Sequence, residues 1–360
     1  MAINVKNLLN NGEFRGVLQG YKIEKETVKA PYTKEGQFNV GDDVVQYRGY
    51  VSILTNPETG QFATVNVRNL QNFYNGELDF TSKALEAMSV EGEVDTYAKT
   101  KDITKTPTVT IKGVGFTDNF YVDKQGEVKE SVNLDLGFGR LYLNDPEEEP
   151  KFENSVLVNG MVRDIRPEIK NDEETGRALV DIYIPYTYGS EKKGTQVIRA
   201  FKTTLVAGVL VDVDEEGEYE IDLGAELLDS ADEVIGDSWK FGVEVNNFYV
   251  EKEAPKTEEE GSRKRFGKRL RETTNTNRQR VSEFLLTGID QLVTPFDEED
   301  VKDALRMREV AIEEAKKRAE ERQDAPAAQK PSRGITRSRG GETTSTESSA
   351  PAGRTRTRRF

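Results

Sequence analysis

The sequence predicts a mainly β chain with two similar domains, followed by a helical segment and a disordered basic tail. Three observations lead to this prediction. Residues 13–250 have the period-two alternation and turn sequences of short β-strands. The tetrapeptide Asn-Phe-Tyr-Val closes a predicted strand at 119–122 and again at 247–250. After residue 325 the chain is rich in Pro, Ser, Gly, Thr and Arg, a composition that cannot bury enough apolar area to fold.

The two copies share one order of elements. In both, a Gly-containing strand comes first, then a hairpin with a Glu-Thr-Gly turn, a short helical pattern and two closing strands. The opening strands are 14–23 and 156–165, and the helical patterns are 81–88 and 225–232. This order is that of a five-stranded Greek-key barrel, the OB-fold, so we expect two OB-like barrels in tandem. A pair of all-β sandwich domains has similar strand spacing and is the alternative.

The sequence beyond the barrels changes in composition. Residues 278–293 have the spacing of an amphipathic helix, and a longer helix follows, with Thr294 as its N-cap and Pro295 in its first turn. We predict a first OB-like domain at 1–141, an acidic linker at 142–153 and a second OB-like domain at 154–252. A basic segment with amphipathic helices follows at 253–325, and a disordered Arg-rich tail at 326–360.

Composition excludes most enzyme chemistry. The chain has no cysteine and no histidine, which removes thiolate and histidine nucleophile systems and the metal sites that these residues form. Carboxylate clusters at 145–149 and 212–224 lie in turn-like sequence without a supporting base. We therefore expect no enzyme activity, no cofactor and no catalytic metal.

The sequence also bears on location. No apolar run approaches the roughly 18 residues that span a bilayer, and the N-terminus lacks the features of a signal peptide. We expect a cytoplasmic protein with no membrane association.

Charge is distributed unevenly along the chain. Residues 1–260 carry 28 Lys and Arg against 49 Asp and Glu, whereas residues 261–360 carry 23 against 16. A basic run attracts phosphate by counterion release, and the alternative is that it neutralises the acidic body. The segment 263–280 contains one acidic residue, Glu272, and these candidate nucleic-acid ligands: Arg263, Lys264, Arg265, Lys268, Arg269 and Arg271.

The outward faces of the central strands supply further candidates. Alternation turns one set of side chains toward each core and leaves arginines and aromatic rings opposite. Flat rings stack on unpaired bases while guanidinium groups hold phosphates, a combination suited to single-stranded nucleic acid. Ordinary cross-strand pairing, or contact with a neighbouring domain, is the alternative. The candidates are Arg48, Tyr50, Phe62 and Arg68 in the first copy, and Arg177, Tyr183, Arg199 and Phe201 in the second.

The repeated tetrapeptide has a structural and a functional interpretation. Alternation places Phe120 and Phe248 on the side opposite to Tyr121 and Tyr249. We expect the phenylalanines to be buried and the tyrosines to lie at the rim, where the hydroxyl stays in water. The repeat is then first the mark of the last strand of each domain, and second a source of binding residues.

The second copy resembles the opening hairpin of single-stranded DNA-binding proteins of the OB-fold type, particularly phage-encoded ones. The likeness rests on VLVNGMVRDIRPEI at 156–169, EETG at 173–176 and RALVDIYIP at 177–185, and it is strongest over 156–202. It implies coating of single strands in phage DNA replication or recombination, and recruitment of other replication proteins. Many members end in an acidic tip, whereas Phe360 here follows a run of arginines.

We therefore expect a non-enzymatic single-stranded DNA-binding protein, with RNA as an alternative ligand and with oligomer formation through 278–323. Two other classes stay open. Tandem β domains with charged helical tails also occur in structural or assembly proteins of virus particles. A Mg²⁺-dependent nuclease or annealing enzyme is the less favoured third reading.

Overall fold

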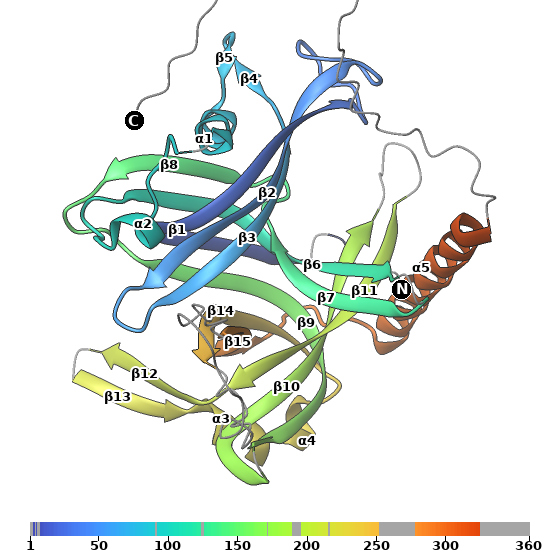
Figure 1. Ribbon diagram of the computed structural model, residues 1–360. Coiled ribbons are helices and arrows are strands. Elements are labelled where there is room, and N and C mark those ends of the chain that lie inside the picture. The colour runs from blue at the N-terminus through green and yellow to red at the C-terminus, as the bar shows by residue number, and fades with distance from the viewer. Residues whose placement is uncertain are drawn as a thin grey trace, which may run out of the picture.

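The computed structural model describes residues 8–90, 92–123, 126–170, 172–188, 196–214, 217–251 and 278–324, together with Ile3 and Val5. The fold is mainly β, as the sequence predicts. An 11-stranded sheet curls into two barrels, and a long helix follows the last strand. In Figure 1 the first barrel runs from blue to teal and the second from green to orange.

The first barrel contains β1 (Asn10–Lys29), β2 (Asp43–Asn56), β3 (Gln61–Leu70), β6 (Pro107–Val122) and β7 (Val128–Asp135). β1, β2 and β3 form an antiparallel meander, and β6 pairs with both β1 and β7. A parallel contact between Asn66 of β3 and Asp135 of β7 brings the third and fifth strands together. This strand order is that of the OB-fold.

The second barrel repeats this order with β9 (Glu153–Lys170), β10 (Glu173–Tyr188), β11 (Val197–Ala207), β14 (Ser238–Glu251) and β15 (Arg278–Gln291). β14 pairs with β9 and β15, and a parallel contact joins Val206 of β11 to Leu285 of β15. The predicted tandem of OB-like barrels is confirmed by these pairings.

Smaller elements lie between the third and fourth strands of each barrel. In the first they are β4 (Phe73–Tyr74), β5 (Glu77–Leu78), α1 (Phe80–Ser89) and α2 (Tyr97–Thr100). In the second they are β12 (Val209–Asp214), β13 (Gly217–Asp222), α3 (Leu223–Asp229) and α4 (Ala231–Val234). The predicted short helices are confirmed, and an aspartate caps the longer helix in each barrel: Asp79 accepts from Ser82 N and Asp222 from Ala225 N.

The predicted linker at 142–153 is partly wrong. Strand β8 (Arg140–Pro146) occupies its first half and pairs antiparallel with β6. Acidic residues and prolines suggested an irregular segment, but Leu141 is fully buried and Leu143 packs against the core. Apolar contacts therefore hold this stretch in the sheet.

The predicted helix at 278–293 is wrong. These residues form β15, the fifth strand of the second barrel, so strand pairing extends that barrel beyond the predicted boundary at 252. The register shifts where Gly242 pairs with Gly288 and Val243 with Leu286, which leaves Thr287 as an extra residue in β15. This bulge breaks period-two alternation, and the resulting spacing of apolar residues resembles that of a helix.

The Asn-Phe-Tyr-Val repeat lies in β6 and β14, the fourth strand of each barrel and not the last. Just before it, an asparagine of the first strand clasps the backbone of the fourth. Asn10 donates to Phe116 O and accepts from Phe116 N, at 2.7 and 2.8 Å. Asn154 makes the same pair of bonds with Val245, both at 2.9 Å. The duplication therefore extends to a side-chain clasp that fixes this strand pairing.

The two barrels are continuous through β1. The first part of β1, Asn10–Arg15, pairs with Val158–Glu153 of β9. The rest of the same edge, from Val17 onward, pairs with β2. A second contact joins Phe62 of β3 to Asn247 of β14. One cluster of buried residues includes side chains from both barrels.

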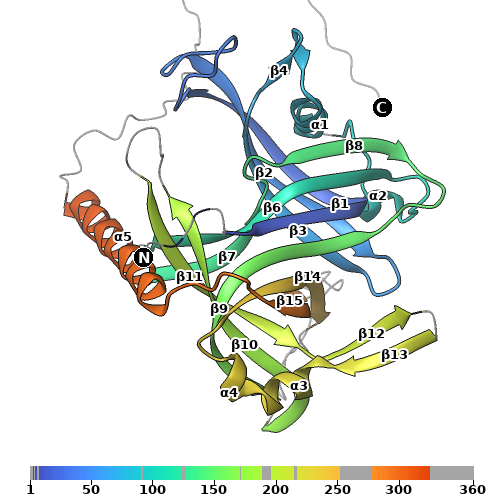
Figure 2. The same cartoon turned by 180° about the vertical axis from the view of Figure 1, so that it is seen from behind.

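Helix α5 (Glu298–Asp324) follows the second barrel. It begins after Asp297, whose carboxylate accepts from Glu299 N at 2.9 Å, so the N-cap is Asp297 and not Thr294. Phe296, Val301 and Ala304 pack with Met161 and Ala200 of the second barrel. Figures 1 and 2 agree in placing α5 beside β7 and β11. No helix in the described ranges is long and apolar enough to cross a membrane.

Replacing Leu286 with Ala tests the assignment of β15. Leu286 has no exposed surface, and truncation of such a side chain costs about 2–5 kcal/mol of unfolding free energy. Ser282→Ala, at an exposed position of the same strand, is the control and should change it by less than about 0.5 kcal/mol. Denaturant titration measures both variants, and equal stabilities would contradict the assignment.

Candidate nucleic-acid interface

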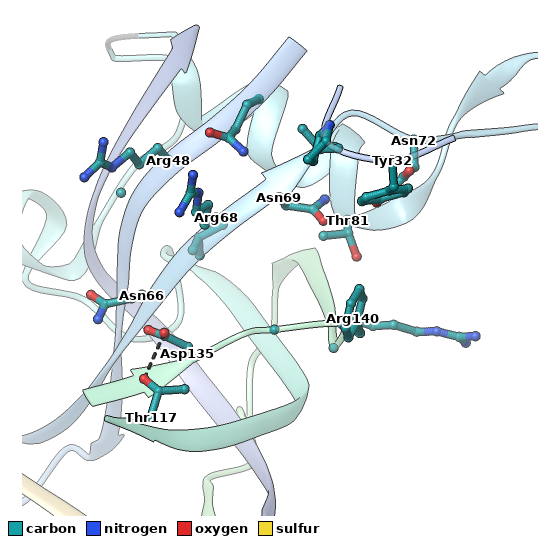
Figure 3. A pocket seen from close by; sticks show the side chains of 18 of the residues that line it. Tyr32, Arg48, Asn66, Arg68, Asn69, Asn72, Thr81, Thr117, Asp135 and Arg140 are labelled. Carbon is teal, nitrogen blue, oxygen red and sulfur yellow. Dashed lines mark hydrogen bonds between the residues drawn. The ribbon is translucent and has the colours of Figure 1, made fainter. Parts of the chain in front are cut away.

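An open cleft of ≈ 1570 Å³ lies on the outer side of the first barrel. Its floor comes from β2 and β3, and its walls from the β1–β2 connection, from β6 and β7, and from the β7–β8 connection. Figure 3 shows Arg48 and Arg68 on neighbouring strands, with Thr117 and Asp135 on another wall.

Two predicted arginines face each other on the floor. Arg48 and Arg68 are directly opposite in the β2–β3 register, and both are exposed. Neither makes an ion pair with any residue that the structure describes. The next pair along is Tyr50 and Asn66, and the Tyr50 ring is exposed on this same face. The sequence therefore placed Arg48, Tyr50 and Arg68 correctly relative to one another.

The β6–β7 hairpin contributes a polar wall. Thr117, Asn119 and Asn133 line the cleft, and Thr117 Oγ1 donates to Asp135 Oδ2 at 2.9 Å. Because side chains alternate across a strand, Tyr121 lies on the same face as Thr117 and Asn119. Its side chain is 57% exposed. The predicted exposure of Tyr121 is confirmed, and this ring extends the cleft wall.

Sequence reasoning missed three residues at the rim: Tyr32, Phe138 and Arg140. Tyr32 lies in the β1–β2 connection, and Figure 3 shows Arg140 extending outward. Phe138 is 101% exposed, in the turn between β7 and β8.

Two glycines build the turn that presents Phe138. Gly137 has φ +53°, and a Cβ on Gly139 would lie 2.2 Å from Lys112 O. A side chain fits at neither position without strain. The sequence GFGR at 137–140, an aromatic residue between two glycines followed by arginine, was the available signal for this rim.

The carboxylates of the cleft are engaged. Asp79 caps α1, Asp135 accepts from Thr117, and Asp118 is ion-paired with Arg308. Arg140, like the two floor arginines, has no ion pair among the described residues. Four cationic residues, Lys34, Arg48, Arg68 and Arg140, line the cleft with three aspartates, one of which is paired with Arg308, so the lining carries a small excess of positive charge on a protein whose net charge is −14. Local potential of this kind, and not net charge, decides where a polyanion binds.

Two predicted stacking rings are not exposed, so that expectation is wrong. Phe62 has 4% of its surface exposed, because β14 covers this part of the outer face through the contact with Asn247. Phe201 has 1% exposed and packs edge-on against Tyr186, with ring centroids 5.6 Å apart. It lies directly opposite Ile184 in the register, which puts it on the core side of the barrel.

The face of the second barrel that corresponds to the cleft floor is covered among the described residues. Helix α5 and Phe296 cover the corresponding outer face, where Tyr183 is half-buried. Asp181 on this face is ion-paired with Arg166 and Lys202, at 2.8 and 2.6 Å. The protein's own side chains thus occupy this part of the surface around Asp181 and Tyr183, so the two copies have diverged.

The two predicted arginines of the second barrel also have protein partners. Arg177 Nε lies 2.8 Å from Glu168 Oε2, and its Nη2 lies 3.2 Å from Glu283 Oε1. The Arg199 guanidinium stacks over the Tyr188 ring at 3.9 Å, on the core-facing side of β11. Neither side chain is presented to the first-barrel cleft.

Several candidates lie outside the described residues. They are the Tyr249 side chain and Arg263, Lys264, Arg265, Lys268, Arg269 and Arg271. The predicted disordered tail at 326–360 also lies outside the described residues. Within the described part of the chain, no group of three or more acidic side chains is arranged to hold a metal ion.

The strand order and the cleft define a tandem OB-fold protein with a cationic, aromatic-rimmed face on its first barrel. The chain belongs to the YorF family, whose profile matches residues 10–318. Among solved structures, a deletion variant of the single-stranded DNA binding protein from Thermus aquaticus is similar over 82% of this chain and 99% of that chain, with 12% identity and a TM-score of 0.38. A search of curated proteins finds no match.

The ion-pair network of the second barrel predicts an acid dependence of stability. The hydrogen bond from Arg177 lowers the pKa of Glu168 to about 2, from an ordinary 4.5. A lowered pKa stabilises the fold above pH 4.5, and this stabilisation is lost as the pH falls through about 2. As the pH falls between these values, the unfolding free energy should fall more steeply in the wild type than in Glu168→Gln. The difference in slope corresponds to the uptake of up to about one more proton on unfolding of the wild type. Denaturant titrations at several pH values measure the slopes, and equal slopes would refute the prediction.

Proposed function

We propose that this chain is a non-enzymatic protein that binds single-stranded nucleic acid, with DNA as the expected ligand, through the cleft of its first barrel. The observation that supports this function most is the arrangement of Arg48, Arg68 and Arg140 around one cleft with the exposed rings of Tyr32 and Phe138. Tyr50 and Tyr121 add two further rings on adjoining surfaces.

In the proposed complex, aromatic side chains contact the bases and cationic side chains contact the phosphates. Bases stack on exposed rings with about 1–3 kcal/mol per base, whatever the sequence. The arginines hold phosphates and release counterions, so affinity should fall steeply with salt. In a duplex the flat faces of the bases are already stacked on one another, whereas a single strand can turn them toward the rings. The open cleft therefore favours single strands.

The cellular role is part of the proposal. The sequence likeness of residues 156–202 to phage single-stranded DNA-binding proteins supports a role in phage DNA replication or recombination, in the host cytoplasm. RNA is the alternative ligand. Other replication proteins are proposed partners, and oligomerisation through 278–323 stays a prediction, although 278–291 form a strand within the second barrel.

Removing the two floor arginines tests the phosphate contacts. The variant Arg48→Ala/Arg68→Ala should bind an oligo-dT strand more weakly than the wild type. It should also lower the slope of log affinity against log salt by about 1.4, since each single-strand phosphate contact contributes about 0.7. Fluorescence anisotropy at a series of salt concentrations measures both quantities.

The matched control is Lys240→Ala/Lys302→Ala, which removes the same charge from the second barrel and α5. Lys240 and Lys302 are ion-paired with Asp290 and Glu298. The control should keep the wild-type salt slope. A wild-type protein that does not bind oligo-dT at low salt would exclude the proposed function and favour a structural role, and equal slopes in all three proteins would exclude this cleft.

Truncating the rim rings tests stacking. Phe138→Ala and Tyr121→Ala should each weaken oligo-dT binding by about 1–3 kcal/mol while leaving the salt slope unchanged, because no charge is lost. Tyr219→Ala, which removes an exposed tyrosine from β13, should bind like the wild type. Quenching of tyrosine fluorescence by the strand gives a second readout. Unchanged affinity in both rim variants would rule out stacking at these positions.

A further inference from the structure

The β6–β7 hairpin has two faces with different partners. Its front face carries Thr117 and Asn119, which line the cleft. Its back face carries Phe120 and Glu130, which are directly opposite in the register. Asp118 borders the cleft as well, but its side chain is 2% exposed and contacts Arg308 behind the wall. One two-stranded ribbon thus forms the wall of the cleft and, on its other side, a docking surface.

Helix α5 docks on the back face through one arginine. Arg308 Nε and Nη2 lie 2.7 and 2.8 Å from the two oxygens of Asp118, a bidentate ion pair. Nη2 also donates to Glu130 at 3.0 Å, and the guanidinium lies 5.7 Å from the Phe120 ring centroid. The hydrogen bonds to Asp118 raise the pKa of Arg308.

This contact is buried. The side chains of Arg308 and Asp118 are 12% and 2% exposed. Tyr186 of the second barrel adds a hydrogen bond from its hydroxyl to Asp118 at 3.3 Å, and burial raises the pKa of Tyr186 to about 12, which keeps that proton in place. Asp118 therefore joins the cleft wall to the second barrel and to α5, and loss of one partner would leave a buried charge without compensation.

On its cleft side the ribbon meets the floor at one point of strand pairing. β3 and β7 meet at the Asn66–Asp135 contact, which is followed by a hydrogen bond from Leu136 N to Asn66 O at 2.9 Å. Beyond this point the floor and the wall diverge and enclose the cleft. The ladders of β6 with β1 and β8 hold the base of the ribbon, and the contacts on its back face fix the position of the rest of the wall relative to Arg48 and Arg68.

We propose that α5, through Arg308, sets the position of the cleft wall, so that docking of α5 and binding of a single strand in the cleft stabilise each other. This inference rests on the proposed function of the cleft. Arg308 is a positioning residue, because it is buried behind the wall and is not among the residues that line the cleft. Coupling of this kind is reciprocal: the ligand strengthens helix docking by the same factor by which docking strengthens ligand binding.

The test compares Arg308→Gln with Arg306→Gln in the full chain, using oligo-dT as the probe. Arg306 lies on the same helix, has a side chain that is 77% exposed and is ion-paired with Asp303 at 3.7 Å. Both variants lose one positive charge. Arg308→Gln should weaken binding at least about fivefold, the lower end of typical coupling between sites, and Arg306→Gln should bind like the wild type.

The salt slope separates positioning from direct contact. Arg308→Gln should keep the wild-type slope, because no phosphate ligand is lost. A slope lower by about 0.7 would mean that Arg308 itself contacts the strand, which would overturn the proposal. Wild-type affinity in Arg308→Gln would overturn it as well. Asp118→Asn, which removes the same ion pair from the other side, should weaken binding in parallel, and its failure to do so would count against the coupling.

A measurement on the wild type does not depend on whether the variants fold. Addition of oligo-dT should slow amide hydrogen exchange in β2 and β3 and also in α5, which lies behind the wall. Protection of β2 and β3 without protection of α5 would overturn the coupling and leave the proposed function standing. Absence of oligo-dT binding by the wild type would overturn both.

Discussion

The architecture depends on the backbone hydrogen bonding of one strand. β1 pairs with β6 along one edge, and with β2 and then β9 along the other, so a single strand closes the first barrel and attaches the second. Because every pairing satisfies backbone groups that would otherwise be buried without partners, neither barrel can shift along β1 without breaking a ladder. The side-chain clasp of Asn10 on Phe116 fixes the same junction. Because β2 and β6 both pair with β1 and both contribute to the cleft of the first barrel, β1 fixes their relative position.

The two barrels show how a duplicated fold can separate its tasks. The first keeps its outer floor open, with Arg48 and Arg68 exposed and without an ion pair to any described residue. The second packs α5 against the corresponding face, where Asp181 is ion-paired with Arg166 and Lys202. Two copies of one topology thus provide one accessible surface and one anchoring surface. The helix that closes the second copy also contacts the back of the first through Arg308.

Local patterns in the sequence were sufficient for the fold class and for part of the site. Alternation was sufficient for the shared face of Arg48, Tyr50 and Arg68, because this face depends on neighbours within one strand pair. Long-range facts were not available from such patterns. The register that places Phe201 opposite Ile184, the coverage of Phe62 by β14, and the bulge at Thr287 all depend on segments distant in sequence. The exposed ring of Phe138 lies in a sequence that could have been recognised, because two glycines flank it in GFGR.

The late position of β15 in the chain has a consequence during synthesis. β14 ends at Glu251, but the strand that covers its free edge begins at Arg278. At a translation rate of about 5–20 residues per second, the ribosome needs about one to five seconds to add the intervening segment. Until β15 has been added and has left the ribosome, this edge of β14 has no partner in its own chain, and an unpaired edge is a template for pairing with other chains. Crowded polysomes, where several nascent copies lie close together, are the setting in which this exposure matters most.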